Sequence, residues 1–92
     1  MSTTPPDPAA KVLVIEDEKT LAGMIAAYLS RAGYQTTVAH TGPDGVQAVR
    51  QQAPDVVILD LGLPGLDGVE VCRQIRTFTD CYVIVVTARK DE

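Results

Sequence analysis

The chain has 92 residues, of which 46% are hydrophobic, and a formal net charge of -4. This length suits one small domain with a single core, and the acidic balance argues against direct binding of nucleic acid. No apolar stretch approaches the roughly 20 residues of a membrane span, and the N-terminus lacks the features of a signal peptide, so we expect a cytoplasmic protein without membrane contact.

Residues 1–10 combine three prolines with small residues and show no periodic apolar pattern, which predicts a flexible tail. From Lys11 onward, short β-branched runs alternate with helical periodicity. This alternation predicts an α/β domain over residues 11–92, in which parallel strands buried on both faces are joined by helical crossovers.

The expected strands are residues 12–16, 35–39, 56–60 and 82–86. The first helix should run from about Thr20 to Ala32, with Gly33 as its stop. Its inward stripe is expected to consist of Leu21, Ile25, Tyr28 and Leu29. The second helix should begin at Gly42-Pro43-Asp44 and end before Ala53-Pro54. Asp67 is expected to cap a third helix, whose inward residues are Val71, Cys72, Ile75 and Phe78.

Polar residues follow three of these strands: Glu16 and Asp17 the first, Asp60 the third, and Thr87 the fourth. Parallel strands of a doubly wound sheet meet at their carboxyl edge, so we expect these side chains to share one crevice. Clustered carboxylates oppose one another's ionisation, and a divalent cation relieves that conflict. Hard oxygen ligands without histidine or cysteine favour Mg²⁺. Beside this ion Asp60 could attack phosphorus and become an aspartyl phosphate.

Three segments resemble the receiver domain of two-component response regulators. They are VLVIEDE at residues 12–18, DLGLPGLDG at residues 60–68 and VVTA at residues 85–88. The resemblance implies a flavodoxin-like parallel sheet with strand order 2-1-3-4. The helices and the segment after the fourth strand are most similar to the winged-helix transcriptional class of these regulators, which implies a role in transcription regulation.

The resemblance also implies a role for each site residue. Asp60 would be the phosphorylated residue, with a sensor histidine kinase as its phosphodonor. Asp17 would bind Mg²⁺ directly, Asp60 would also be a metal ligand, and Glu16 would assist through water. The backbone carbonyl of Gly62 would complete the protein's share of the metal shell. Thr87 would hydrogen-bond the phosphoryl group and act as the switch residue.

The resemblance covers strands one to four and helices one to three, and we interpret residues 11–92 as a truncated receiver domain. The family continues through a fourth helix, a fifth strand with an aromatic switch residue and a lysine after it, and a fifth helix. No lysine of this sequence is assigned to that position. The fourth strand would then be a bare apolar edge, which predicts a homodimer or an oligomer with exchanged elements.

Two other functions fit these residues less well than that of a receiver domain. A phosphohydrolase also forms an aspartyl phosphate, but it needs a second acid two residues on, where this chain has Gly62. Neither of the glycine-rich phosphate-binding motifs is present, which disfavours a nucleotide-binding module. We therefore expect a signalling domain and not an enzyme. The alternative is a receiver-like fragment that is not phosphorylated and acts only as a structural or dimerisation module.

Five further residues invite chemistry that we do not assign to them. Cys72 and Cys81 lack metal-ligand spacing and are expected to be buried reduced thiols. His40 should be solvated or capping in a loop. Tyr28 and Phe78 fit helix stripes and are expected in the core.

Overall fold

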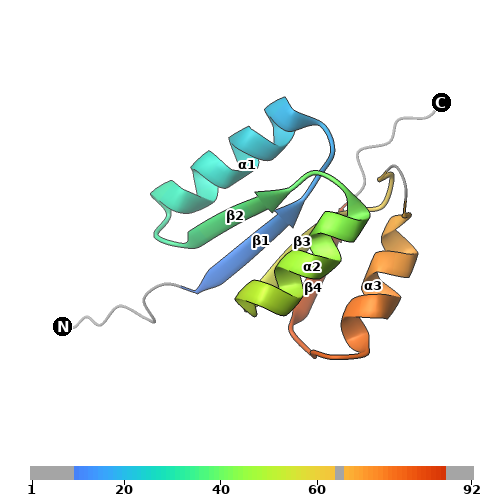
Figure 1. Cartoon of the computed structure of the whole chain (residues 1–92). Coiled ribbons are helices and arrows are strands. Elements are labelled where there is room, and N and C mark those ends of the chain that lie inside the picture. Colours follow the sequence, from blue (N-terminus) through green and yellow to red (C-terminus); the bar gives the residue numbers. More distant parts are fainter. Residues whose placement is uncertain (1–9, 64–65, 87–92) are drawn as a thin grey trace.

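The computed structural model describes residues 10–63 and 66–86, which form a four-stranded parallel sheet with helices on both faces (Figure 1). The elements in chain order are β1 (Lys11–Ile15), α1 (Lys19–Arg31), β2 (Gln35–Ala39), α2 (Gly42–Gln52), β3 (Val56–Asp60), α3 (Gly68–Arg76) and β4 (Tyr82–Val86). The strand order is β2-β1-β3-β4. The predicted fold class and strand order are therefore confirmed, with β1 and α1 each beginning one residue earlier than expected.

Each helix begins where a side-chain oxygen accepts a hydrogen bond from a backbone N–H of the first turn. Glu18 Oε1 accepts from the N–H of Leu21 at 3.1 Å at the start of α1. Thr41 caps α2 in the same way, and Asp67 Oδ1 accepts from the N–H of Glu70 at 3.0 Å at the start of α3. These bonds satisfy N–H groups that have no partner within the helix. The cap predicted at Asp67 is confirmed.

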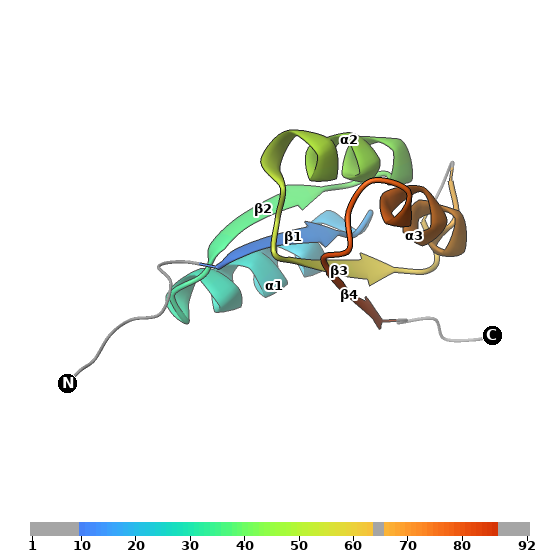
Figure 2. The ribbon, with the colours of Figure 1, turned by 90° about the horizontal axis from the view of Figure 1, so that it is seen from below.

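The main core lies between the sheet and the pair α2 and α3, which cover one face (Figure 2). Alternate residues of the central strands point to this face because side chains alternate along a strand. The fully buried aliphatic residues of this core are Leu13, Ile15, Val57, Leu59, Val71 and Ile75. Val12 and Val14 are also buried, with Ala22 of α1, so β1 is covered on both faces.

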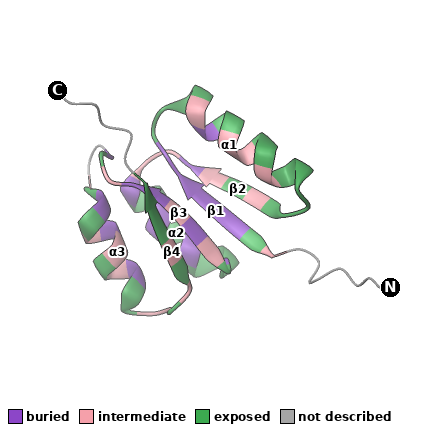
Figure 3. Ribbon diagram, turned by 180° about the vertical axis from the view of Figure 1, so that it is seen from behind, coloured by how far each residue is buried: buried purple, intermediate pink, exposed green. Residues whose placement is uncertain are grey.

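The opposite face of the sheet is covered unevenly. Figure 3 shows α1 beside β1 and β2, whereas β4 is mostly exposed. Tyr82 is 77% exposed, and Ile84 and Val86 are 52% and 39% exposed. The prediction that every strand is buried on both faces is therefore wrong for β4, because α1 does not reach across the sheet to it. Among the described residues, β4 is the last strand on that side of the sheet.

Several expected core residues are less buried than predicted. Tyr28 is 75% exposed, so its prediction as a core residue is wrong; α1 buries only Ala22 completely. Phe78 is half-buried, and the guanidinium carbon of Arg50 lies 4.2 Å from the centre of its ring. Cys72 and Cys81 are free thiols but only half-buried. None of the described helices is both long and apolar enough to cross a membrane.

The exposed side of α3 carries an ion pair that predicts a pH effect on stability. Glu70 accepts hydrogen bonds from the Nε of Arg73 at 2.9 Å and from the side-chain amide of Gln74 at 3.0 Å. The Arg73 guanidinium first, and then Gln74, lower the pKa of Glu70 from 4.5 to about 2. A lowered pKa means that the folded chain binds this proton more weakly than the unfolded chain, so the stabilisation is present above pH 4.5 and is lost as the pH falls toward 2.

We therefore expect Glu70→Gln to be less stable than the wild-type chain at neutral pH and to match it near pH 2. Urea denaturation at a series of pH values measures this difference. A gap between the two proteins that stayed constant over the whole acid range would contradict the assignment of the pair as a source of stability.

Candidate acidic site at the carboxyl edge of the sheet

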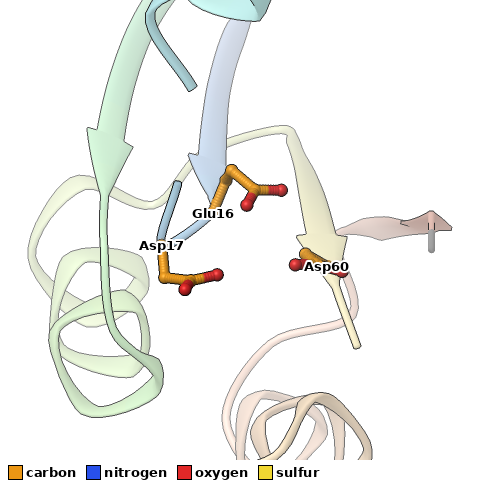
Figure 4. A group of neighbouring side chains, drawn as sticks. All are labelled: Glu16, Asp17 and Asp60. Carbon is orange, nitrogen blue, oxygen red and sulfur yellow. The ribbon is translucent and has the colours of Figure 1, made fainter. Parts of the chain in front are cut away.

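Two neighbouring parallel strands deliver the acidic residues to one place. The register aligns Ile15 of β1 with Leu59 of β3, so Glu16 and Asp60 follow side by side at the same edge. Figure 4 shows Glu16, Asp17 and Asp60 around a common space. One carboxylate oxygen from each of the three lies within 4.8 Å of the others. The structure thus brings together the three carboxylates that the sequence predicted would meet.

Backbone N–H groups hold two of these carboxylates in place. Glu16 is only 4% exposed, and its Oε2 accepts a hydrogen bond from the N–H of Glu18 at 3.0 Å. Asp60 is 9% exposed, and its Oδ1 accepts from the N–H of Gly62 at 3.2 Å. Asp17 is exposed and faces the other two from the solvent side. The site therefore has a buried floor of two oriented carboxylates and an open side.

Burial and like charge both act on Glu16. Its burial raises the pKa of its carboxyl group above 4.5, and the negative charges of Asp60 and Asp17 raise it further, while the N–H of Glu18 lowers it. The buried carboxylates oppose one another, and a cation placed among them would relieve this repulsion. Three hard oxygen donors, with no histidine or cysteine among the three, fit Mg²⁺ better than a softer metal.

His40 is a neighbour of the site that the sequence interpretation missed. Its Nδ1 lies 3.0 Å from the backbone oxygen of Glu16, and because a carbonyl only accepts, Nδ1 carries the proton in this contact. The ring is half-buried. The signal was present in the topology: β1 and β2 are parallel with Ile15 opposite Ala39, so the residues that follow them are also adjacent. His40 therefore lies in the predicted loop after β2 and, of the two predicted roles, takes the capping one, at the carbonyl of Glu16.

The loop after Asp60 is held by the start of α3. The N–H of Gly68 donates to the carbonyl of Leu61 at 3.3 Å. The two segments approach so closely that a Cβ at Gly68 would lie 2.6 Å from the Cα of Leu61. This position accepts only glycine without movement of the backbone, and it fixes the chain immediately after Asp60.

Two residues predicted for the site remain untested by this geometry. Gly62 is placed two residues after Asp60, but its carbonyl as a metal ligand stays a prediction. Thr87 lies outside the described residues, as do residues 1–9 of the predicted tail. Glu16, Asp17 and Asp60 are therefore the part of the predicted site that the structure assembles.

Comparison with known families gives an independent description of the chain. The family described as response regulator receiver domain matches residues 12–92. The match includes Glu16, Asp17 and Asp60, which build the site.

Solved structures of similar shape come from several bacteria. The BeF3-activated N-terminal receiver domain of Klebsiella pneumoniae RstA is 29% identical, with a TM-score of 0.82 over 89% of this chain and 70% of its own. The signal receiver domain of a putative LuxO repressor protein from Vibrio parahaemolyticus is 31% identical, with a TM-score of 0.82 over 90% of this chain and 65% of its own.

A third similar structure is the N-terminal domain of a response regulator/sensory box/GGDEF 3-domain protein from Carboxydothermus hydrogenoformans. It is 33% identical, with a TM-score of 0.82 over 89% of this chain and 67% of its own. The chain also spans 56% of the length of a fusion that contains a yeast Spc42 trimeric coiled coil. The chain therefore spans between 56% and 70% of the length of these four matched chains.

Proposed function

This chain belongs to the response regulator receiver domain family, and we propose that it accepts a phosphoryl group on Asp60 from a histidine kinase with the help of Mg²⁺. The single observation that carries the proposal is the meeting of Glu16, Asp17 and Asp60 within 4.8 Å at the carboxyl edge of the sheet. A buried, oriented aspartate beside two further carboxylates is suited to phosphoryl transfer.

In the proposed reaction a carboxylate oxygen of Asp60 forms a bond to phosphorus while the donor's P–N bond breaks, and the donor imidazole takes up a proton. With a small acyl phosphate the P–O bond breaks and the acid leaves. The hydrogen bond from Gly62 to Oδ1 keeps the Asp60 carboxylate oriented during this attack. Bound Mg²⁺ would offset part of the negative charge of the phosphoryl oxygens and of the carboxylates.

The other predicted site residues each have a separate role in this proposal. Asp17, on the open side, would bind the metal directly, and buried Glu16 would act through water. The Gly62 carbonyl would complete the protein ligands. Thr87 would hydrogen-bond the phosphoryl group, as the family resemblance implies.

We propose that the domain is a cytoplasmic signalling switch and not an enzyme that turns over a free substrate. The similarity to the winged-helix class is the basis for proposing an output in transcription. The competing function is a structural or dimerisation module without phosphotransfer.

Labelling with acetyl phosphate tests the proposal. We expect the wild-type chain to gain one phosphoryl group in the presence of Mg²⁺ and none with EDTA, as measured by intact-protein mass spectrometry. Asp60→Asn keeps an oxygen that can accept from Gly62 but removes the nucleophile, so it should gain none. Asp80→Asn, an exposed change outside the acidic cluster, should behave as wild type. If the Asp60 variant were labelled as much as the wild-type chain, or if the wild-type chain were not labelled, the proposed phosphorylation of Asp60 would be wrong. The structural module would then be the better-supported function.

A further inference from the structure

The end of β2 and the residue after it hold the backbone of Glu16 by two hydrogen bonds. The N–H of Glu16 donates to the carbonyl of Ala39 at 3.0 Å. The carbonyl of Glu16 lies 3.0 Å from Nδ1 of His40, which donates to it. The N–H and C=O of an extended residue point to the same side, so both bonds come from the side of β2. The two peptide groups that flank the Glu16 side chain are therefore both fixed.

The bond from His40 replaces a backbone bond that the sheet does not form at this point. In a parallel ladder that continued past Ala39, the carbonyl of Glu16 would accept from the N–H of Thr41. However, β2 ends at Ala39, and Thr41 is already the cap of α2. Among the described residues, no backbone N–H donates to the Glu16 carbonyl. The His40 side chain thus provides a donor where the backbone provides none.

His40 is itself held in place by the start of α2. Thr41 follows it directly, and Oγ1 of Thr41 accepts a hydrogen bond from the N–H of Asp44 at 3.1 Å. The first turn of α2 lies against the end of β1, because a Cβ at Gly45 would be 2.5 Å from Cδ1 of Ile15. The His40 ring is also half-buried. Its donor is therefore pre-organised by a rigid segment of the fold.

The hydrogen bond from His40 acts on the peptide group that joins Glu16 to Asp17. This group is planar and trans, so its N–H points away from its carbonyl oxygen. The carbonyl faces the side of β2, and the N–H of Asp17 therefore faces the side of β3, where Asp60 lies (Figure 4). One hydrogen bond thus sets the direction in which the chain presents Asp17 to Asp60.

Asp17 is the acidic residue that depends most on its backbone. The carboxylates of Glu16 and Asp60 are buried, and each accepts a hydrogen bond from a backbone N–H. Asp17 is exposed, and no backbone N–H within the described part of the chain donates to its carboxylate. Its position in the acidic cluster is therefore set mainly by the peptide groups that carry it.

We propose that His40 is a positioning residue for Mg²⁺: by holding the peptide group between Glu16 and Asp17, it keeps the Asp17 carboxylate where it can bind the ion. This inference rests on the proposed function, in which Asp17 is the direct metal ligand. His40 is not a ligand itself, because its ring nitrogens lie outside the cluster of oxygens within 4.8 Å. Loss of a group that orients a metal ligand typically weakens metal binding by roughly 10–100-fold. The lower end of this range applies here, since His40 acts through the backbone.

Magnesium binding by the 92-residue chain tests the proposal without any phosphorylation. The Kd for Mg²⁺ is measured from the amide NMR signals of Asp17 and Gly62 as MgCl₂ is added. His40→Leu keeps an apolar side chain but removes the donor, so it should raise this Kd by about tenfold. His40→Asn should bind Mg²⁺ nearly as tightly as wild type, because its amide nitrogen is as many bonds from the backbone as Nδ1 of histidine and also donates.

Asp55→Ala is the matched control for a loss of stability alone. Oδ2 of Asp55 accepts from the N–H of Lys11 at 2.8 Å, a bond between a side chain and the backbone at the opposite end of β1. Its removal should lower the free energy of unfolding in urea, as His40→Leu does, but leave the Kd for Mg²⁺ unchanged. If His40→Leu does not fold, His40→Gln takes its place, because its amide lies one bond farther out and should bind Mg²⁺ more weakly than the asparagine variant.

The outcomes separate this inference from the proposed function. An unchanged Kd in the leucine or glutamine variant, with normal Mg²⁺ binding and labelling of the wild-type chain, would refute the role of His40 and leave the proposed function standing. Equal weakening of the leucine and asparagine variants would also refute it, because the ring would then act only by filling space. A wild-type chain that did not respond to Mg²⁺ would overturn both.

Discussion

Glu16→Gln is expected to stabilise the metal-free chain by on the order of 1 kcal/mol, the size of an ordinary single-residue effect. Glu16 is buried and lies beside Asp60 and Asp17, and both its burial and their charges raise its pKa. The ionised form of Glu16 therefore lowers the free energy of unfolding of the metal-free chain. Glutamine removes the charge and can still accept the hydrogen bond from Glu18.

The sign of the pH dependence follows from the raised pKa. The folded chain binds this proton more tightly than the unfolded chain. The loss of stability caused by ionised Glu16 therefore begins as the pH rises above 4.5 and reaches its full size above the raised pKa of the folded chain. The advantage of the Glu16 variant should therefore be largest at neutral pH and shrink in acid. Urea denaturation with EDTA at several pH values measures it.

The same substitution should weaken the stabilisation by Mg²⁺. A ligand that binds only the folded state adds RT ln(1 + [L]/Kd) to the free energy of unfolding. Millimolar Mg²⁺ should therefore raise the free energy of unfolding of the wild-type chain, and it should raise that of the Glu16 variant by a smaller amount. Glu18→Gln is the matched control, because Glu18 is exposed, lies outside the cluster and keeps a capping oxygen as glutamine. A destabilised metal-free Glu16 variant with unchanged response to Mg²⁺ would contradict the like-charge account of the site.

Gly68→Ala should lower the free energy of unfolding by about 1–3 kcal/mol, the usual cost of overpacking. The added Cβ would lie 2.6 Å from the Cα of Leu61, and backbone atoms cannot turn aside as a flexible side chain can. Because Leu61 directly follows Asp60, movement of this loop should also slow labelling by acetyl phosphate. Denaturation and the rate of labelling measure the two effects.

Gly23→Ala is the control for this prediction. Gly23 lies within α1, and a Cβ there would meet nothing within 4 Å. Alanine should raise the free energy of unfolding by about 0.5–1 kcal/mol through its better helix propensity. Equal effects of the two substitutions would mean that the close approach of α3 to the Asp60 loop does not constrain the chain.

The acidic site was largely predictable because it depends on strand ends. Glu16 and Asp60 each close an apolar run, and parallel strands bring such ends to one edge whatever the details of packing. The contact of His40 with this site was missed because it depends on the register between β1 and β2. The contact with the Glu16 carbonyl needs the Ile15 and Ala39 pairing, which no local pattern reveals.

Local patterns in the sequence by themselves determined the elements, the caps and the parallel α/β class, because turn chemistry and apolar periodicity act over a few residues. Only the tertiary structure decided how much of each element is covered. Tyr28 fits the inward stripe of α1 yet is exposed, and β4 has the composition of a buried strand yet is mostly exposed among the described residues. Burial depends on which neighbour lies opposite a side chain, and periodicity carries no information about that neighbour.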